Sequence, residues 1–139
     1  MTPDEILGLP DGYINDILGG PDHTLTIPVS EWLNSNDRTH WAVRYRASQK
    51  LRVDATIIAL ANIKNKYQKI HVLAYTHKTH NRKYDAHNLM PTLKPIIDGI
   101  VKAGVIPDDT NDHLIGPDLR QGNKTLTPKI TLHITAIKE

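Results

Sequence analysis

Apolar and polar residues alternate along three stretches of this chain, and the alternation predicts three β-strands. These stretches are residues 24–29, 69–77 and 127–137. The side chains expected to face a core are Leu25, Ile27, Val29, Ile70, Val72, Ala74, Ile130, Leu132, Ile134 and Ala136. A fourth strand is expected to begin within residues 112–115, and residues 117–126 are expected to form a turn region.

Apolar positions three and four residues apart predict two helices. The first spans about residues 47–63, with a stripe of Leu51, Ala55, Ile58 and Asn62 that is widened by Val53, Ile57, Leu60 and Ala61. The second carries Leu93, Ile96, Ile97, Ile100 and Val101. Asn88 or Thr92 is expected to cap the start of the second helix, and Gly104 is expected to follow its end.

The resulting order, β-α-β-α-β-β, predicts a mixed α/β (α+β) fold with two main helices on a mixed sheet. We expect residues 1–139 to form a single domain, with residues 1–22 as an irregular N-terminal segment. The chain has no cysteine, which excludes disulfides and thiolate zinc sites. It has neither an apolar run of roughly 20 residues nor a basic start typical of signal peptides. We therefore expect a soluble cytoplasmic protein with no membrane partner.

Charge is unevenly distributed, although the net charge is only +2. Residues 38–83 hold most of the lysine and arginine and a single acid, Asp54. The other acids lie before residue 38 and, for the most part, between residues 85 and 118. A basic surface beside an acidic pocket suits a metal-dependent nuclease, because cations hold the DNA backbone and carboxylates hold the metal. A solvated basic face is the other interpretation.

One window of 25 residues contains Asp85, Lys94, Asp98, Asp108 and Asp109. The second predicted helix separates its two acidic ends. A helix of roughly ten residues is about 15 Å long, and the chain can fold back over that length. Asp85 and the Asp108-Asp109 pair can then meet around one divalent cation. Mg²⁺ takes oxygen ligands and acts on phosphates.

Each part of this window also has an ordinary interpretation. Aspartate is common in turns, so Asp85 can be an ordinary turn residue. Asp108 and Asp109 can form a solvated turn, although adjacent acids near the negative end of a helix dipole are unfavourable without a cation. Lys94 and Asp98 can form a surface ion pair, or they can line a pocket in which Lys94 faces a phosphate.

The remaining motifs exclude several chemistries. The eight histidines show no H-x₃-H or H-E-x-x-H spacing, which argues against a zinc site. No G-x-S-x-G, P-loop or G-x-G-x-x-G motif occurs. His87 lies between Asp85 and Asn88, so it can ligate a metal, act as a base or contact a phosphate.

The chain resembles RusA-type Holliday-junction resolvases in an ordered set of short motifs. The motifs are Asp85-Ala86-His87-Asn88-Leu89, Lys94, Asp98-Gly99, Lys102-Ala103-Gly104-Val105-Ile106 and Asp108-Asp109. The phage and prophage branch is most similar, through Asn88-Leu89-x-Pro91-Thr92-x-Lys94, Gly116-Pro117-Asp118-Leu119-Arg120 and Asn36-Asp37-Arg38-x-His40-Trp41. The resemblance covers about residues 34–124.

This resemblance implies a small homodimeric, Mg²⁺-dependent endonuclease that resolves four-way DNA junctions by paired nicks, in recombination and repair. Mn²⁺ is a possible substitute metal, and the setting is the cytoplasm of a bacterial or phage-infected cell. By position, Asp85 and Asp109 are expected to be catalytic metal ligands and Lys94 the catalytic lysine. His87 stands where the best-known members have a second aspartate. Either His87 replaces that ligand, or Asp98 or Asp108 completes the set.

The branched DNA partner is expected to be held through phosphates, and therefore by its shape. The residues expected to contact it are Arg38, His40, Arg44, Arg46, Lys50, Arg52, Lys78, Arg82, Lys83 and Asn88. A second hypothesis, motivated by His87, is a non-catalytic DNA-binding module whose metal site has decayed. A purely structural domain agrees less well with five polar groups in one window.

Overall fold

The computed structural model describes residues 6–8, 20–36 and 40–137. Its strands are β1 (His23–Pro28), β2 (Ile70–His77), β3 (Leu114–Gln121) and β4 (Lys129–Ala136). Its main helices are α3 (Trp41–Asn62) and α4 (Met90–Lys102), and a short 3₁₀ helix, η1 (Ala86–Leu89), precedes α4. The predicted mixed α+β class and the order β-α-β-α-β-β are confirmed. In the described ranges, no helix has both the length and the apolar character needed to cross a membrane.

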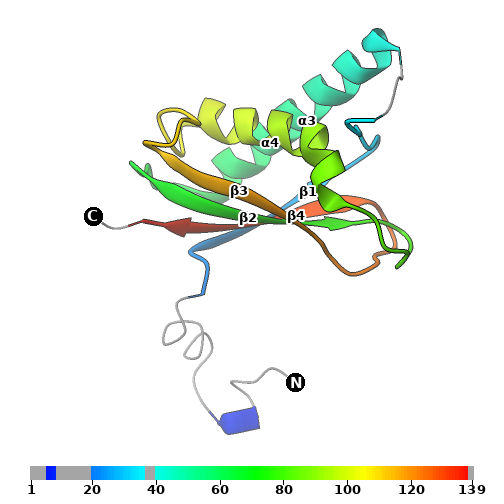
Figure 1. Ribbon diagram of the computed structural model, residues 1–139. Helices are drawn as coiled ribbons and strands as arrows, with labels where there is room; N and C mark the ends of the chain where they lie inside the picture. The colour runs from blue at the N-terminus through cyan, green and yellow to red at the C-terminus, as the bar shows by residue number, and fades with distance from the viewer. Residues whose placement is uncertain (1–5, 9–19, 37–39, 138–139) are drawn as a thin grey trace.

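The four strands form one sheet in the order β1-β4-β2-β3. β4 runs antiparallel to both β1 and β2, whereas β2 and β3 are parallel. The parallel pair is connected through η1 and α4, as parallel strands require a crossover. Figure 1 shows α3 and α4 together on one face of the sheet. Neither α3 nor α4 covers the opposite face (Figure 1).

The core lies between this sheet and the two helices. Alternate strand residues point to it because of the pleat, and the predicted inward positions are buried or nearly so. Those with no exposed surface are Ile27, Ile70, Val72, Ala74, Ile130, Leu132 and Ile134. Leu93, Ile96 and Ile100 of α4 are equally buried.

The first helix is longer than predicted and buries a narrower stripe. α3 begins at Trp41 because the side chain of His40 accepts a 3.2 Å hydrogen bond from the backbone N–H of Ala42. The buried residues of α3 are Ala47, Leu51, Ala55 and Ala59. The prediction that Val53, Ile57, Leu60 and Ala61 widen the buried stripe is wrong, since the first three are more than half exposed and Ala61 is exposed as well. Asn62, which was expected on the stripe itself, is also exposed. Small alanines let the helix pack closely along a thin line of contact.

Neither candidate cap starts the second helix. Thr92 is fully buried inside α4, and Asn88 lies in η1. Asp85 caps η1 instead, through a hydrogen bond from the N–H of His87. Gly104 follows α4 with a φ of +84°, which agrees with its predicted role at the helix end.

The predicted turn region is partly wrong, because β3 continues to Gln121. Gly116 and Pro117 are ordinarily poor strand residues. β3 lies at the edge of the sheet, and its pairing with β2 shifts register between His71 and Leu73. An edge strand with a bulge tolerates a proline because no ladder hydrogen bond is required there.

Candidate active site

Lys94 lies between two carboxylates that come from different parts of the chain. Its Nζ is 3.6 Å from Oδ1 of Asp98, one turn further along α4. The same Nζ donates a 2.6 Å hydrogen bond to Oδ2 of Asp109, fifteen residues away in sequence. The structure therefore brings together three residues that the sequence places in one acidic window.

The loop after α4 returns Asp109 to the helix because its first half is anchored in the core. Gly104 adopts a left-handed conformation that ends the helix. Val105 and Ile106 then enter the core, where each is 2% exposed. The carbonyl of Val105 accepts a 2.8 Å hydrogen bond from the N–H of Tyr67.

Lys94 and Asp109 shift each other's pKa in the directions that keep both charged. The hydrogen bond from Lys94, together with its positive charge, lowers the pKa of Asp109. The hydrogen bond to Asp109 is the main influence that raises the pKa of Lys94, while partial burial acts in the opposite direction. The Lys94 side chain as a whole is still 61% exposed.

Arg52 of α3 completes this group, because its Nη2 lies 3.7 Å from Oδ2 of Asp98. We call Arg52, Lys94, Asp98 and Asp109 the Lys94 cluster. The helices approach closely at Gly99, where an added Cβ would lie 2.6 Å from the carbonyl oxygen of Arg52. Gly99 belongs to the Asp98-Gly99 motif, but the motif did not indicate this close approach between the helices. A glycine inside an amphipathic helix was the available signal of such an approach.

Asp85 lies where the loop after β2 meets η1. Its Oδ1 accepts a 3.0 Å hydrogen bond from the N–H of His87, and both side chains are exposed. The preceding residue, Tyr84, is fixed at two points. Its hydroxyl is 2.6 Å from Oγ1 of Thr76, and its N–H donates a 3.3 Å bond to Oε1 of Gln121. These bonds hold the backbone before Asp85 against β2 and β3.

Asn88 and the start of α4 are joined to the segment that leads into α3. The N–H of Ser35 donates a 2.8 Å hydrogen bond to the carbonyl of Asn88. The buried hydroxyl of Thr92 accepts a 2.7 Å bond from the N–H of Leu33 and donates a 2.8 Å bond to its carbonyl. The motif around Asn88 and the beginning of α3 therefore lie at the same end of the molecule.

The carboxylates of the acidic window have the hard oxygen donors that Mg²⁺ prefers. Their present positions do not form a cage: Asp98 and Asp109 face Lys94, and Oδ1 of Asp108 accepts a hydrogen bond from the N–H of Asp109. In residues 6–8, 20–36 and 40–137, no three His, Asp or Glu side chains gather closely enough to hold a metal ion. Metal binding shared by Asp85 and Asp109 stays a prediction, as do the other expected ligand roles.

The basic residues expected to hold DNA form two groups. Arg44, Arg46, Lys50 and Arg52 belong to α3, whereas Lys78, Arg82 and Lys83 follow β2. Three of the first group have partners within the chain: Nη1 of Arg44 donates to the carbonyl of Asn34, Lys50 pairs with Asp54 at 2.7 Å, and Arg52 contacts Asp98. Arg46, Arg82 and Lys83 are exposed. The expected contact Arg38 lies outside the described residues.

Lys78 packs against two aromatic rings, a contact that the sequence did not indicate. Its Nζ lies 4.4 Å from the ring centre of Tyr84 and 5.6 Å from that of Trp32. Burial, and then the charge of Arg82, lowers the pKa of Lys78. The cation therefore packs against the residue that precedes Asp85.

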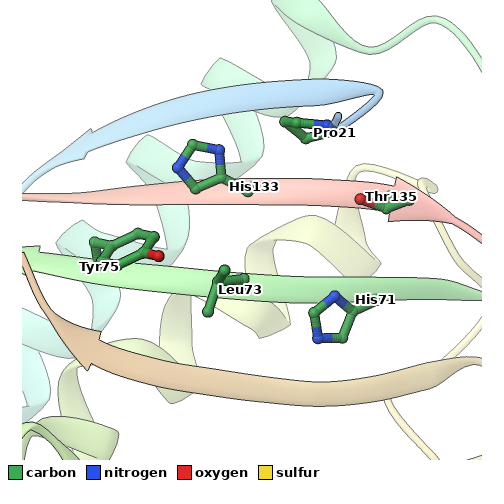
Figure 2. Close-up of a pocket in the computed structure, with 6 residues that line it drawn as sticks. All are labelled: Pro21, His71, Leu73, Tyr75, His133 and Thr135. Carbon is green, nitrogen blue, oxygen red and sulfur yellow. The ribbon is translucent and has the colours of Figure 1, made fainter. Parts of the chain in front are cut away.

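A separate hollow lies on the face of the sheet opposite α3 and α4 (Figure 2). It is lined by Pro21, His71, Leu73, Tyr75, His133 and Thr135. His71 is 2.7 Å from Asp118, and the ring of Tyr75 meets that of His133 edge-on. The sheet separates this hollow from α4, so it is not part of the Lys94 cluster.

Comparison of the sequence with protein-family models gives no match, and comparison with curated proteins gives no significant match. The geometry of the site and the motif resemblance are therefore the two grounds on which a function can be assigned.

Proposed function

We propose that this protein is a metal-dependent, structure-selective endodeoxyribonuclease that resolves four-way DNA junctions by paired nicks. Its biological setting would be DNA recombination and repair in the cytoplasm of a bacterial or phage-infected cell. The proposal rests on one observation above all: an exposed lysine is held between two carboxylates of the acidic window.

The arrangement supports phosphodiester hydrolysis through charge. The ammonium group of Lys94 is positioned by Asp98 and Asp109, and the side chain as a whole is largely exposed. Such a fixed cation stabilises the negative charge that develops on a phosphate during attack. Arg52 adds a second positive charge beside Asp98. The two groups of basic residues supply contacts to the phosphates of the arms.

Mg²⁺, with Mn²⁺ as a substitute, is the proposed cofactor, and Asp85, Asp98, Asp108 and Asp109 supply suitable oxygens. The bound ion would contribute a Lewis acid and an activated water. We assign two tasks to Asp109: its carboxylate orients Lys94, and it also ligates the metal ion.

We further propose that two copies act together. A junction has two symmetric strands to cut, whereas the chain carries one Lys94 cluster. Two cuts at a fixed separation then require two chains, and a C₂ dimer supplies them through one self-complementary interface.

A non-catalytic DNA-binding module is the alternative function. His87 favours it, because this exposed imidazole stands where the related resolvases have a carboxylate. The absence of a three-ligand group among the described side chains also agrees with it.

Cleavage of labelled DNA by the purified protein tests the two functions against each other. The substrates are a four-way junction, a replication fork and a linear duplex of equal length, each with Mg²⁺ or with EDTA. The nuclease is expected to nick the junction only with Mg²⁺ and to leave the duplex intact. Junction binding without cleavage in Mg²⁺ or Mn²⁺ would establish the alternative.

A further inference from the structure

We infer that Trp41 and Tyr45 of α3 stack against unpaired DNA bases, a few nucleotides from the phosphodiester that is cut. This inference rests on the proposed function and specifies its substrate: a DNA whose bases are unpaired or easily unpaired beside the cleavage point.

Both aromatic side chains are unusually accessible. Trp41 is 73% exposed and Tyr45 is 59% exposed, whereas the other aromatic side chains of the described ranges are half-buried or better covered. Figure 1 shows the first turns of α3 rising away from the sheet. Large apolar rings in such a position gain nothing from the core, and a planar base is a partner that would cover them.

A line of polar contacts leads from Tyr45 to the Lys94 cluster. Trp41, Tyr45 and Gln49 follow one another at intervals of four residues, and Arg52 comes three residues later, so they share one side of the helix. Nε2 of Gln49 donates a 2.8 Å hydrogen bond to the hydroxyl of Tyr45. Nη1 of Arg52 donates a 2.9 Å bond to Oε1 of Gln49. Arg52 then contacts Asp98 within the cluster.

The charge of this part of α3 favours nucleic acid over another protein surface. From Trp41 to Asp54 the helix carries Arg44, Arg46, Lys50 and Arg52 against one acid, Asp54, which pairs with Lys50. Interleaved cations and aromatic rings are the arrangement with which proteins hold single-stranded nucleic acid: the cations follow the backbone and the rings take the bases.

The distance matches a short run of nucleotides. At about 1.5 Å per residue, Tyr45 and Trp41 are roughly 10 and 16 Å along the helix axis from Arg52. Stacked bases in one strand are about 3.4 Å apart. A strand that passes the Lys94 cluster and follows α3 therefore presents its bases to the two rings after roughly three to five nucleotides.

Base-dependent binding tests the inference without any need for cleavage. The probes are a single-stranded thymidine oligonucleotide and an oligonucleotide of the same length that carries abasic residues instead, both in EDTA. The wild-type protein is expected to bind the first at least about tenfold more tightly, as expected for one or two stacked bases. In a Trp32→Phe background, the fluorescence of Trp41 is expected to fall when the thymidine oligonucleotide binds.

Four variants locate the effect. Trp41→Ala combined with Tyr45→Ala is expected to reduce the preference for bases to within about twofold, whereas Trp41→Phe combined with Tyr45→Phe keeps it. Val53→Ala and Ile57→Ala are matched controls, since these exposed apolar residues lie on the same helix beyond Arg52. Equal affinity of the wild-type protein for both oligonucleotides overturns the inference, as does an equal loss in the control variants.

The inference and the proposed function fail in different ways. Junction cleavage with no preference for bases would refute stacking and leave the nuclease in place. A base preference that depends on the two rings, without cleavage by any metal, would support stacking and refute the nuclease. Loss of dimer mass in the alanine double variant, with base preference unchanged, would assign this surface to contact between copies and overturn stacking.

Discussion

Nζ of Lys94 lies 2.6 Å from Oδ2 of Asp109, so a residue of α4 is joined to the loop that follows the helix. Both partners are charged at neutral pH, and each shifts the pKa of the other so that the charged pair persists over a wider pH range. A divalent cation that binds Asp109 must share this carboxylate with Lys94. The same contact therefore links the position of the lysine to metal binding.

Replacement of Lys94 by methionine should separate the contribution of the lysine to cleavage from its effect on metal binding by Asp109. Asp109 and Asp98 lose the ammonium group that competes for their oxygens, so Mn²⁺ is expected to bind about as tightly as in the wild-type protein or more tightly. Junction cleavage is expected to fall strongly because the fixed cation beside the phosphate is gone. Calorimetric titration with Mn²⁺ and a cleavage assay on the same preparation measure both. Weaker metal binding in Lys94→Met would contradict this account of the contact.

The contribution of this ion pair to stability should depend on pH. The lowered pKa of Asp109 means that its contribution is present above its ordinary value of 3.8 and is lost as pH falls through the folded value. The raised pKa of Lys94 means that its contribution is present below 10.5 and is lost above the folded value. Urea unfolding in EDTA measures the difference in the free energy of unfolding between wild type and Lys94→Met. This difference should be below about 1 kcal/mol at pH 7 because the lysine is largely exposed. It should shrink as pH falls below 3.8 and through the lowered pKa of Asp109, and a difference that does not change with pH would argue against the ion pair.

Gly99→Ala should destabilise the protein and disturb the Lys94 cluster. The new Cβ would lie 2.6 Å from the carbonyl oxygen of Arg52 and 2.8 Å from Cβ of Ala55, so the helices must separate. Overpacking of this kind costs roughly 1–3 kcal/mol, although alanine is the better helix former. Ala61→Gly, at an exposed position of α3, serves as the control for the difference in helix propensity between alanine and glycine. A variant with wild-type stability would show that the close approach is unimportant.

Thr92→Val should lower stability because two buried backbone groups lose their hydrogen-bond partner. The hydroxyl of Thr92 satisfies both the N–H and the carbonyl of Leu33, and valine leaves both without a partner. An unsatisfied buried group costs about 1–3 kcal/mol. Thr26→Val is the matched control, because Thr26 is exposed on β1. Thermal unfolding of both variants checks the prediction, and equal melting temperatures would contradict it.

His87 gives the sharpest test of how this chain differs from the resolvases it resembles. If the imidazole takes the place of their carboxylate, His87→Asp should keep cleavage and shift its preference from Mn²⁺ toward Mg²⁺, because carboxylate is the harder ligand. His87→Ala should weaken the dependence of cleavage on metal concentration. Unchanged rates and metal preference in both variants would make His87 a bystander on η1.

The fold could be predicted largely from the sequence because β1, β2 and β4 alternate between buried and more exposed residues and α4 has one continuous apolar stripe. The buried stripe of α3 could not be predicted correctly because apolar residues lie on several sides of this helix. Val53 and Ile57 are as apolar as the buried Leu51 but face solvent. β3 was missed beyond Ile115 because Gly116 and Pro117 ordinarily end strands, and only the edge position of β3 permits them.

The candidate site was predictable in composition and less so in arrangement. The motif placed Lys94, Asp98 and Asp109 in one window, and these residues do meet. The partnership of Arg52 with Asp98 depends on how closely two helices pack at Gly99. Such a tertiary distance is not encoded in local spacing.

The most direct test of the nuclease compares Asp109→Asn with Asp112→Asn, an exposed acid of the same loop. Cleavage of a four-way junction in Mg²⁺ and binding of the same junction in EDTA are measured for both. The cleavage rate of Asp109→Asn is expected to fall by more than the roughly 10–100-fold that is typical when a residue only supports a metal ligand. Its junction affinity should stay within a few-fold of wild type, and Asp112→Asn should cleave normally. Junction cleavage by Asp109→Asn at the wild-type rate would contradict the proposed active site.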